Sequence, residues 1–411
     1  MYVICGMNPP PFSGIRVLEL ASVLAGPQVG QFFAELGAEV LKVESPAGDV
    51  TRTWKTAAET SAASAPADTA VSAYFAASNW GKKSLMLDLT TAAGQATLHR
   101  LATQTDVILA SYKPGDAEKL HADYATLSQE NPRLIYGHLT GYGPDSVRAG
   151  YDAVLQAEAG FMFLNAGGPG QPPQKMPVAL VDLLAAHQLK EGLLTALFQR
   201  EKTGRGTLVQ VSLLDSALAS LANQAATFLI TGHDPQPLGS GHPSIVPYGT
   251  VYQAADGRQL VLAVGSDGQF RHLCAALQKP AWAADVRFVT NVARVAHRAE
   301  LEVLLTERIA AVDGDALLIE LVRRAVPAGA VRSVGEALRQ SSAQPMLLPA
   351  GDGLGAGLRT VAFRSSAWSV AAFLSAPPRL GPAAAIQDEP RAPANPETPA
   401  PLPCVSPSSY K

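Results

Sequence analysis

The first 44 residues contain two apolar strands joined through a helix, and this unit restricts the fold more than any other feature. Gly14–Leu20 is typical of a buried strand, Gln28–Gly37 of a short helix ending at a glycine, and Ala38–Glu44 of a second strand. Strands connected through a helix pair in parallel, because the crossover returns the chain to the same end of the sheet. The sequence therefore predicts an α/β fold.

The same alternation recurs further along the chain. Lys83–Leu89, Thr105–Ser111 and Pro132–Tyr142 predict strands, with helical patterns at 90–104 and 116–131 between them. We expect an open, Rossmann-like parallel sheet of the doubly wound type. The loop after the first strand carries Gly26-Pro27 and no GxGxxG, which disfavours NAD or FAD binding. A helix N-terminus can still bind an anion there.

The remaining pattern predicts a second, smaller α+β unit. We expect a large Rossmann-like domain at 1–225, a linker with a glycine- and histidine-containing loop at 226–244, a small domain at 245–335, and a return to the large domain at 336–380. A hairpin is predicted at Gly249–Gly265 with Asp256-Gly257 at its turn. A strand followed by one long apolar helix is expected after Thr207. The Pro- and Ala-rich tail 381–411 is expected to be flexible.

Composition excludes several classes of function. Charged residues are 16% of the chain and the net charge is −3, which disfavours nucleic-acid binding. No apolar stretch reaches the ~18 residues of a membrane span. The N-terminus lacks the pattern of a signal peptide, and three scattered cysteines fit a reducing compartment. We therefore expect a cytoplasmic protein without a membrane or nucleic-acid partner and without a metal site.

Asp182 is the candidate catalytic residue. The chain has neither GxSxG nor a Walker loop, but Asp182 lies within the apolar run MPVALVDLLAA, at the start of a helix predicted over Asp182–Arg200. One interpretation is a helix cap, worth about 0.5–2 kcal/mol. The other is a partly buried carboxylate that acts as a nucleophile. On the residues alone both interpretations stay open.

Several segments in order resemble the class III CoA-transferase family, which includes formyl-CoA transferase, carnitine CoA-transferase and the α-methylacyl-CoA racemases. The resemblance runs from Gly14 to about Gly381 and rests on these segments: GIRVLELASVLAGP, AELGAEVLKVESPAGDVTR, NWGKKSLMLDL, YKPG, LTGYGPD, AGYDAVLQAEAG, the Asp182 helix, KTGRG, HPSIVPYG and PAGAVRSVGEAL. It implies a Rossmann-like large domain, a small domain, and a homodimer of two interlocked rings.

The resemblance also implies a mechanism, with CoA entering as part of a substrate and no permanently bound cofactor. Asp182 would attack an acyl-CoA thioester to form a mixed anhydride, which CoA thiolate converts to an aspartyl-CoA thioester. The implied CoA-binding residues are Val23, Leu24, Ala25, Lys82, Lys83, Lys119 and Tyr142. The implied cover of the intermediate is the loop that contains Gly241, His242 and Ser244.

Transfer is favoured over racemisation. Racemase members pair a His-Asp dipeptide with the helix aspartate and a glutamate in the small domain, whereas this chain has Tyr151-Asp152 and lacks the glutamate in AVGSDGQF. The segments look most like the branch that moves CoA from succinyl-CoA to dicarboxylates. Arg148, His242 and Ser244 are the expected contacts for a second carboxylate. Intramolecular transfer within a diacid, a racemase-like enzyme and a non-catalytic acyl-CoA-binding protein remain alternatives.

Overall fold

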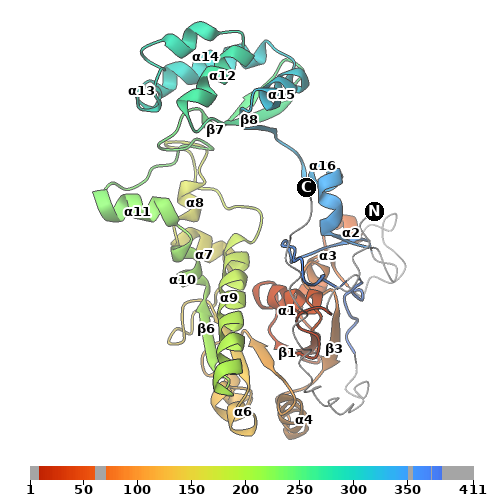
Figure 1. Cartoon of the computed structure of the whole chain (residues 1–411). Helices are drawn as coiled ribbons and strands as arrows, with labels where there is room; N and C mark the ends of the chain where they lie inside the picture. Colours follow the sequence, from red (N-terminus) through yellow and green to blue (C-terminus); the bar gives the residue numbers. More distant parts are fainter. Residues whose placement is uncertain (1–8, 61–70, 350–354, 372, 382–411) are drawn as a thin grey trace, which may run out of the picture.

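The computed structural model describes residues 9–60, 71–349, 355–371 and 373–381. A lower body holds a large sheet, and a smaller unit of helices and short strands stands above it (Figure 1). The Ala-, Ser- and Thr-rich stretch Asp49–Val71 is predicted from the sequence to be a surface excursion, and its residues 61–70 lie outside the described residues. Almost all of the tail predicted to be flexible, 381–411, also lies outside them.

The large sheet has six strands, all parallel, in the order β3-β2-β1-β4-β5-β6. This confirms the predicted open parallel α/β sheet. β1 lies inside the sheet, with Val17 opposite Val40 of β2 on one side and Val107 of β4 on the other. The strands are β1 (Arg16–Leu20), β2 (Glu39–Glu44), β3 (Lys82–Met86), β4 (Val107–Ala110), β5 (Ile135–Thr140) and β6 (Leu208–Ser212).

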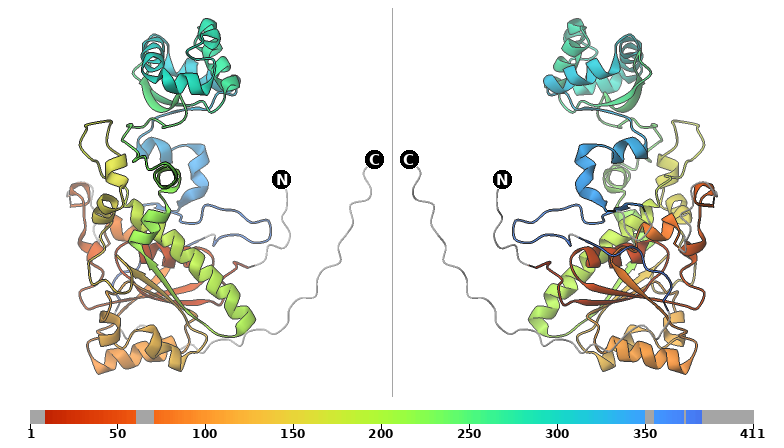
Figure 2. Two further views of the ribbon diagram at one scale, coloured as in Figure 1. Left: turned by 90° about the vertical axis from the view of Figure 1, so that its left-hand side faces the viewer. Right: turned by 90° about the vertical axis from the view of Figure 1, so that its right-hand side faces the viewer.

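Helices cover both faces of this sheet, as the two further views show (Figure 2). Side chains alternate between the faces along each strand. Val17 and Val107 accordingly belong to a core with α1 and α9, while Leu18 and Ile108 belong to a second core with α4. The helices of the lower body are α1 (Ala25–Glu35), α2 (Ala57–Thr60), α3 (Ala73–Ala76), α4 (Ala92–Ala102), α5 (Asp116–Lys119), α6 (Tyr124–Glu130), α7 (Asp152–Glu158), α8 (Phe161–Leu164), α9 (Leu180–Thr203), α10 (Leu213–Ala219) and α11 (Ala222–Thr231), with a 3-10 turn η1 (Val50–Thr53).

Two predicted helices are each divided in the structure. The pattern at 116–131 forms α5 and α6, and His121 between them has a left-handed backbone with φ 51°. The long apolar helix expected after Thr207 forms α10 and α11, with Ala222 at φ 46° where they meet. A left-handed residue cannot continue a right-handed helix. Hydropathy continues across both breaks, so the pattern alone did not reveal them.

The upper unit has its own antiparallel sheet and its own buried core. The predicted hairpin is confirmed as β7–β8, with Gly257 at φ 81° in its turn. Its elements are β7 (Tyr248–Gln253), β8 (Gln259–Ala263), α12 (Asp267–Ala276), η2 (Pro280–Ala284), α13 (Asn291–Ala296), α14 (Arg298–Ala310), α15 (Gly314–Arg323) and β9 (Ala328–Ala330).

The chain then returns to the lower body, where buried Glu35 of α1 accepts hydrogen bonds from the backbone N–H groups of Thr360 and Val361 at 2.6 and 3.2 Å. This last segment contains α16 (Val334–Leu338), η3 (Ser341–Met346), β10 (Leu347–Leu348) and β11 (Gly357–Leu358). Across the described part of the chain no single helix is long and apolar enough for a membrane span. The pair α10 and α11 meets the length and composition test only when joined across its 71° bend.

Candidate active site

Two cavities meet at Asp182, beside the edge of the sheet where β1, β4 and β5 end. The first encloses about 300 Å³ and the second about 440 Å³. β1 and β4 are neighbours in the sheet, but the chain continues from β1 towards β2 on one side and from β4 towards β5 on the other. In open α/β sheets ligands bind in the crevice between two such strands, at their carboxyl ends. Residues shared by the two cavities are Val23, Leu24, Tyr151, Asp152 and Asp182.

Asp182 is the third residue of α9, and its carboxylate does not cap the helix. The cap position is Ala179, which offers no side-chain acceptor. The backbone N–H of Val181, which has no acceptor within the first turn of the helix, instead donates to Oδ1 of Asp152 at 2.8 Å. The interpretation of Asp182 as a cap is therefore wrong, because Asp152 fills that role from α7. Only 8% of Asp182 is exposed, and its carboxylate has no hydrogen bond or ion pair with the residues that the structure describes.

The environment of Asp182 favours its neutral form. Burial, the larger cause, and the neighbouring charge of Asp152 raise the pKa of Asp182 to about 7. Removing a carboxylate from water weakens its hydration, and a second carboxylate repels it. Close to neutral pH the group is therefore a poorly solvated carboxylate, which is a better nucleophile than the same group in water.

This raised pKa predicts the pH dependence of any reaction in which Asp182 attacks. Only the deprotonated form is nucleophilic, so kcat/KM should fall as the pH drops below about 7. Asp152→Asn keeps an acceptor for Val181 but removes the repelling charge, and should move the inflection to lower pH. The measurement is kcat/KM from pH 5 to 9 for both proteins. An unmoved inflection would contradict the assigned effect of Asp152.

Asp152 is itself held firmly. The buried side chain of Gln156 donates to Asp152 Oδ2 at 2.8 Å and accepts from the backbone N–H of Met176 at 2.9 Å. The segment before α9 is thereby fixed to the first turns of α7. Tyr151 forms the N-cap position of α7 and is 61% exposed, lining both cavities.

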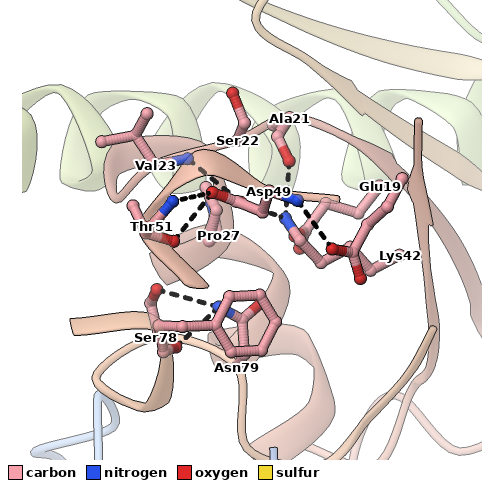
Figure 3. Close-up of polar contacts among 12 residues, drawn as sticks. Glu19, Ala21, Ser22, Val23, Pro27, Lys42, Asp49, Thr51, Ser78 and Asn79 are labelled. Carbon is pink, nitrogen blue, oxygen red and sulfur yellow. Dashed lines mark hydrogen bonds and ion pairs between the residues drawn. The ribbon is translucent and has the colours of Figure 1, made fainter. Parts of the chain in front are cut away.

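A buried ion-pair network lies beneath the turn between β1 and α1 (Figure 3). Glu19 binds Lys42 at 3.0 Å and Lys82 at 2.7 Å, and Lys42 also binds Asp49 at 3.0 Å. These four residues are at most 4% exposed. Each ammonium has three N–H groups and three partners: Lys42 adds the carbonyl of Ala21, and Lys82 adds Pro27 O and Asn79 Oδ1. Two positive and two negative charges balance within the network, which we call the Glu19 network.

The Glu19 network supports the wall of the site. Asp49 accepts from the backbone N–H of Val23 at 3.3 Å, and Val23 has a left-handed backbone with φ 71°. A β-branched residue in this conformation is strained, by about 1–3 kcal/mol. The Ser111 hydroxyl after β4 accepts from Ser22 N at 3.2 Å. These contacts position the turn at Val23 and Leu24, which lines both cavities beside Asp182.

The three lysines expected to bind CoA phosphates lie elsewhere. The prediction for Lys82 is wrong, because its buried ammonium is fully occupied within the Glu19 network. Burial lowers the pKa of Lys82 to about 8, and Glu19 offsets this only in part. Lys83 is exposed on the edge strand β3, and Lys119 pairs with Asp116 at 2.8 Å. Neither lines either of the two cavities at Asp182, whereas Lys113, within the quoted YKPG segment, lines the first.

Arg148 also lines the first cavity, with its guanidinium already engaged. It donates to Oε1 of Glu158 at 2.5 Å and lies 3.9 Å from the ring centre of Tyr142. Tyr142 is half-buried beneath it and is not among the cavity-lining residues. Val23, Leu24 and Ala25, which the family resemblance implies as CoA contacts, line the first cavity.

The loop with Gly241, His242 and Ser244 packs on the upper unit. Ser244 N donates to His242 Nδ1 at 3.1 Å, and Arg298 of α14 donates to the carbonyl of His242 at 2.7 Å. None of these loop residues lines either cavity within one chain. The resemblance places this loop over Asp182, whereas within one chain it contacts α14 of the upper unit.

Sequence reasoning did not select three residues of the second cavity. Trp54 and Tyr74 pack edge to face with ring centres 5.0 Å apart, and Lys175, on the segment before α9, lines the same cavity. Trp54 lies within the Asp49–Val71 stretch that the sequence predicts as a surface excursion, and Tyr74 follows that stretch by three residues. The presence of these two aromatic residues near an Ala- and Ser-rich stretch was the sequence signal that could have indicated a binding site there.

The fold and the site together define an α/β protein with a buried carboxyl group of raised pKa at the switch point of a Rossmann-like sheet. Comparison with known proteins specifies the class further. The chain belongs to CoA-transferase family III, whose family model matches residues 12–383. This confirms the resemblance found in the sequence.

Individual relatives agree with this family. The chain is 42% identical over 331 residues to a succinate–glutarate CoA-transferase of Agrobacterium fabrum, covering 80% of this chain and 81% of the relative. It is 33% identical to a succinyl-CoA–D-citramalate CoA-transferase of Chloroflexus aurantiacus, covering 80% of each. A crystal structure of a CAIB/BAIF family protein from Brucella suis superposes with a TM-score of 0.79 at 38% identity, covering 90% of this chain and 96% of that one.

Proposed function

We propose that this protein transfers CoA from succinyl-CoA to a free dicarboxylic acid, with Asp182 as the covalent nucleophile. The observation that carries the proposal is the buried Asp182 carboxylate, without a described partner, where two cavities meet. One cavity can hold the CoA thioester and the other the acid. Relatives named for succinate, glutarate and citramalate supply the substrate class.

The proposed reaction has four exchanges at three carbonyl carbons, those of the donor, of Asp182 and of the acceptor. A carboxylate oxygen of Asp182 attacks the thioester carbon, the C–S bond breaks, and CoA leaves as a thiolate from a mixed anhydride. The thiolate attacks the aspartyl carbon and releases the donor acid, which leaves Asp182 as a CoA thioester. The acceptor carboxylate attacks that thioester, and CoA thiolate is released again. The thiolate then attacks the acceptor carbonyl, so that acyl-CoA leaves and the Asp182 carboxylate is restored.

We assign CoA to the first cavity. Val23, Leu24 and Ala25 form one wall, and Lys113 and Arg148 bring positive charge to it. The N-terminal backbone of α1 begins at the same wall, and its N–H groups favour oxygen atoms that gain negative charge. Lys83 and Lys119 remain more distant candidates for phosphate contact; Lys82 is not included.

The direct test is to incubate the protein with succinyl-CoA and a panel of free acids. We expect new acyl-CoAs and, after rapid quenching, a CoA adduct on the peptide that contains Asp182, both detected by mass spectrometry. Exchange of the α-proton in D₂O without CoA transfer would instead indicate the racemase-like alternative. Transfer within a single added diacyl-CoA, with no free acceptor, would indicate the intramolecular alternative.

We also propose a homodimer, the interlocked arrangement implied by the family resemblance. Apolar side chains on α11 are uncovered: Leu229 and Ile230 are 78% and 83% exposed. A second copy covering this helix is also the simplest way to bring a Gly241–Ser244 loop over Asp182, since the loop of the same chain lines neither cavity. Light scattering should give a molar mass near twice that of one chain, and a mass of one chain would overturn the proposal.

A further inference from the structure

The second cavity has a distinctive distribution of charge. Its described walls contain the aromatic rings of Trp54, Tyr74 and Tyr151 and the carboxylates of Asp152 and Asp182. Among those described lining residues, Lys175 is the single cationic side chain. An anionic acid entering beside two aspartates meets repulsion, so a cation in the same cavity decides which acids can enter.

The position of Lys175 is set by the backbone around it. Its ammonium donates to the carbonyls of Met176 and Pro177 at 2.7 and 3.3 Å, and lies 4.0 Å from Oδ2 of Asp152. Buried Gln156 holds the same segment, accepting from Met176 N and donating to Asp152. Lys175 is thus fixed relative to Asp152, and through the Val181 contact relative to Asp182.

This ammonium also retains capacity for a ligand. Two of its three N–H groups go to carbonyls, and the Asp152 contact at 4.0 Å is beyond hydrogen-bond distance. The side chain is 38% exposed, so an entering carboxylate can reach it. Arg148 does not line this cavity; it lines the first one, where its guanidinium is paired with Glu158.

We infer that Lys175 binds the distal carboxylate of a dicarboxylic acceptor while the proximal carboxylate attacks the thioester on Asp182. The inference rests on the proposed function and assigns a residue to its acid specificity. It replaces the expectation that Arg148, His242 and Ser244 bind the second carboxylate. The aromatic rings pack along the methylene chain between the two carboxylates. Because only a diacid has a distal carboxylate for Lys175, a short diacid fits better than a monocarboxylate.

The test compares glutarate with pentanoate, which differs by a methyl group in place of one carboxylate, using succinyl-CoA as donor for both. An effect on the donor half-reaction cancels in the ratio of the two kcat/KM values. Lys175→Gln should lower the glutarate-to-pentanoate ratio by about 10- to 100-fold, the loss typical of one charge-assisted hydrogen bond. Lys175→Arg should restore most of the ratio. Circular dichroism and thermal unfolding verify that each variant is folded.

Two further variants separate the inference from simpler effects. Lys202→Gln removes an equal charge near the C-terminal end of α9, about 30 Å along that helix from Asp182, and should leave the ratio unchanged. Arg148→Gln should raise the KM for succinyl-CoA without lowering the ratio. An equal loss for both acids in Lys175→Gln would overturn the inference and assign Lys175 to neutralising Asp152. A wild-type protein that transfers CoA to neither acid would overturn the proposed function instead.

Discussion

Asp182→Asn is expected to abolish CoA transfer, with a loss of at least about 1000-fold in kcat, while the protein stays folded and binds acyl-CoA. Asparagine has nearly the shape of aspartate, but its amide cannot form the anhydride or the thioester. Loss of a covalent nucleophile removes the pathway rather than slowing one step. The measurement is initial velocity with succinyl-CoA and glutarate, together with mass spectrometry of the quenched protein. Turnover within tenfold of wild type would overturn the mechanism.

The stability of the same variant provides the control for folding. The folded pKa of Asp182, about 7, lies above its ordinary value of 3.8 because of burial and Asp152. Its proton-linked stability is therefore fully present below about pH 4 and is lost as the pH rises through 7. Asp182→Asn does not titrate, so its Tm relative to wild type should rise between pH 4 and pH 8. A variant inactive because it unfolds would show a lower Tm at every pH.

The same substitution at the neighbouring Asp152 tests whether Asp182 is the nucleophile or only part of its surroundings. Asp152→Asn alters charge beside Asp182 and keeps an acceptor for the helix N–H of Val181. It should retain the CoA adduct on the Asp182 peptide, whereas Asp182→Asn should show none. An adduct found on Asp152 in the Asp182 variant would reassign the nucleophile.

Local patterns in the sequence were sufficient for the sheet and for Asp182. The strands are apolar runs of ordinary length with helical spacing between them, and each such pattern depends on a few adjacent residues. Asp182 was identifiable because a charged residue within an apolar run needs an explanation. Its apparent role as a cap was wrong because the true cap is Asp152 on another helix, 29 residues before the Val181 N–H that it accepts from.

Contacts between distant residues account for what the sequence did not predict. Lys82 and Lys83 are adjacent, yet one is buried and the other exposed, since successive strand residues point to opposite faces. Nothing local shows that Glu19, 63 residues earlier, will bind Lys82. Lys175 was overlooked for a similar reason, because its cavity is formed by several segments that are separated in the chain.

Glu19→Ala is expected to cost about 3–5 kcal/mol in the free energy of unfolding, because it leaves two buried ammonium groups without their shared carboxylate. Lys42 retains Asp49, but Lys82 loses its only described carboxylate partner. Packing adds to the constraint: a Cβ on Gly30 of α1 would lie 1.8 Å from Glu19 Oε2, so the helix approaches this carboxylate closely. Urea unfolding followed by circular dichroism measures the change.

Glu39→Ala provides the matched control for that measurement. Glu39 is also a strand glutamate paired with a cation, Arg16 at 3.5 Å, but its side chain is 65% exposed. Exposed pairs contribute little, so this variant should differ from wild type by less than about 1 kcal/mol. Equal effects of the two substitutions would contradict the role assigned to the Glu19 network. Asp49 belongs to the same network through Lys42 and accepts from the backbone N–H of Val23 beside Asp182. Activity in Glu19→Ala should therefore fall even without urea, at temperatures where the protein remains folded.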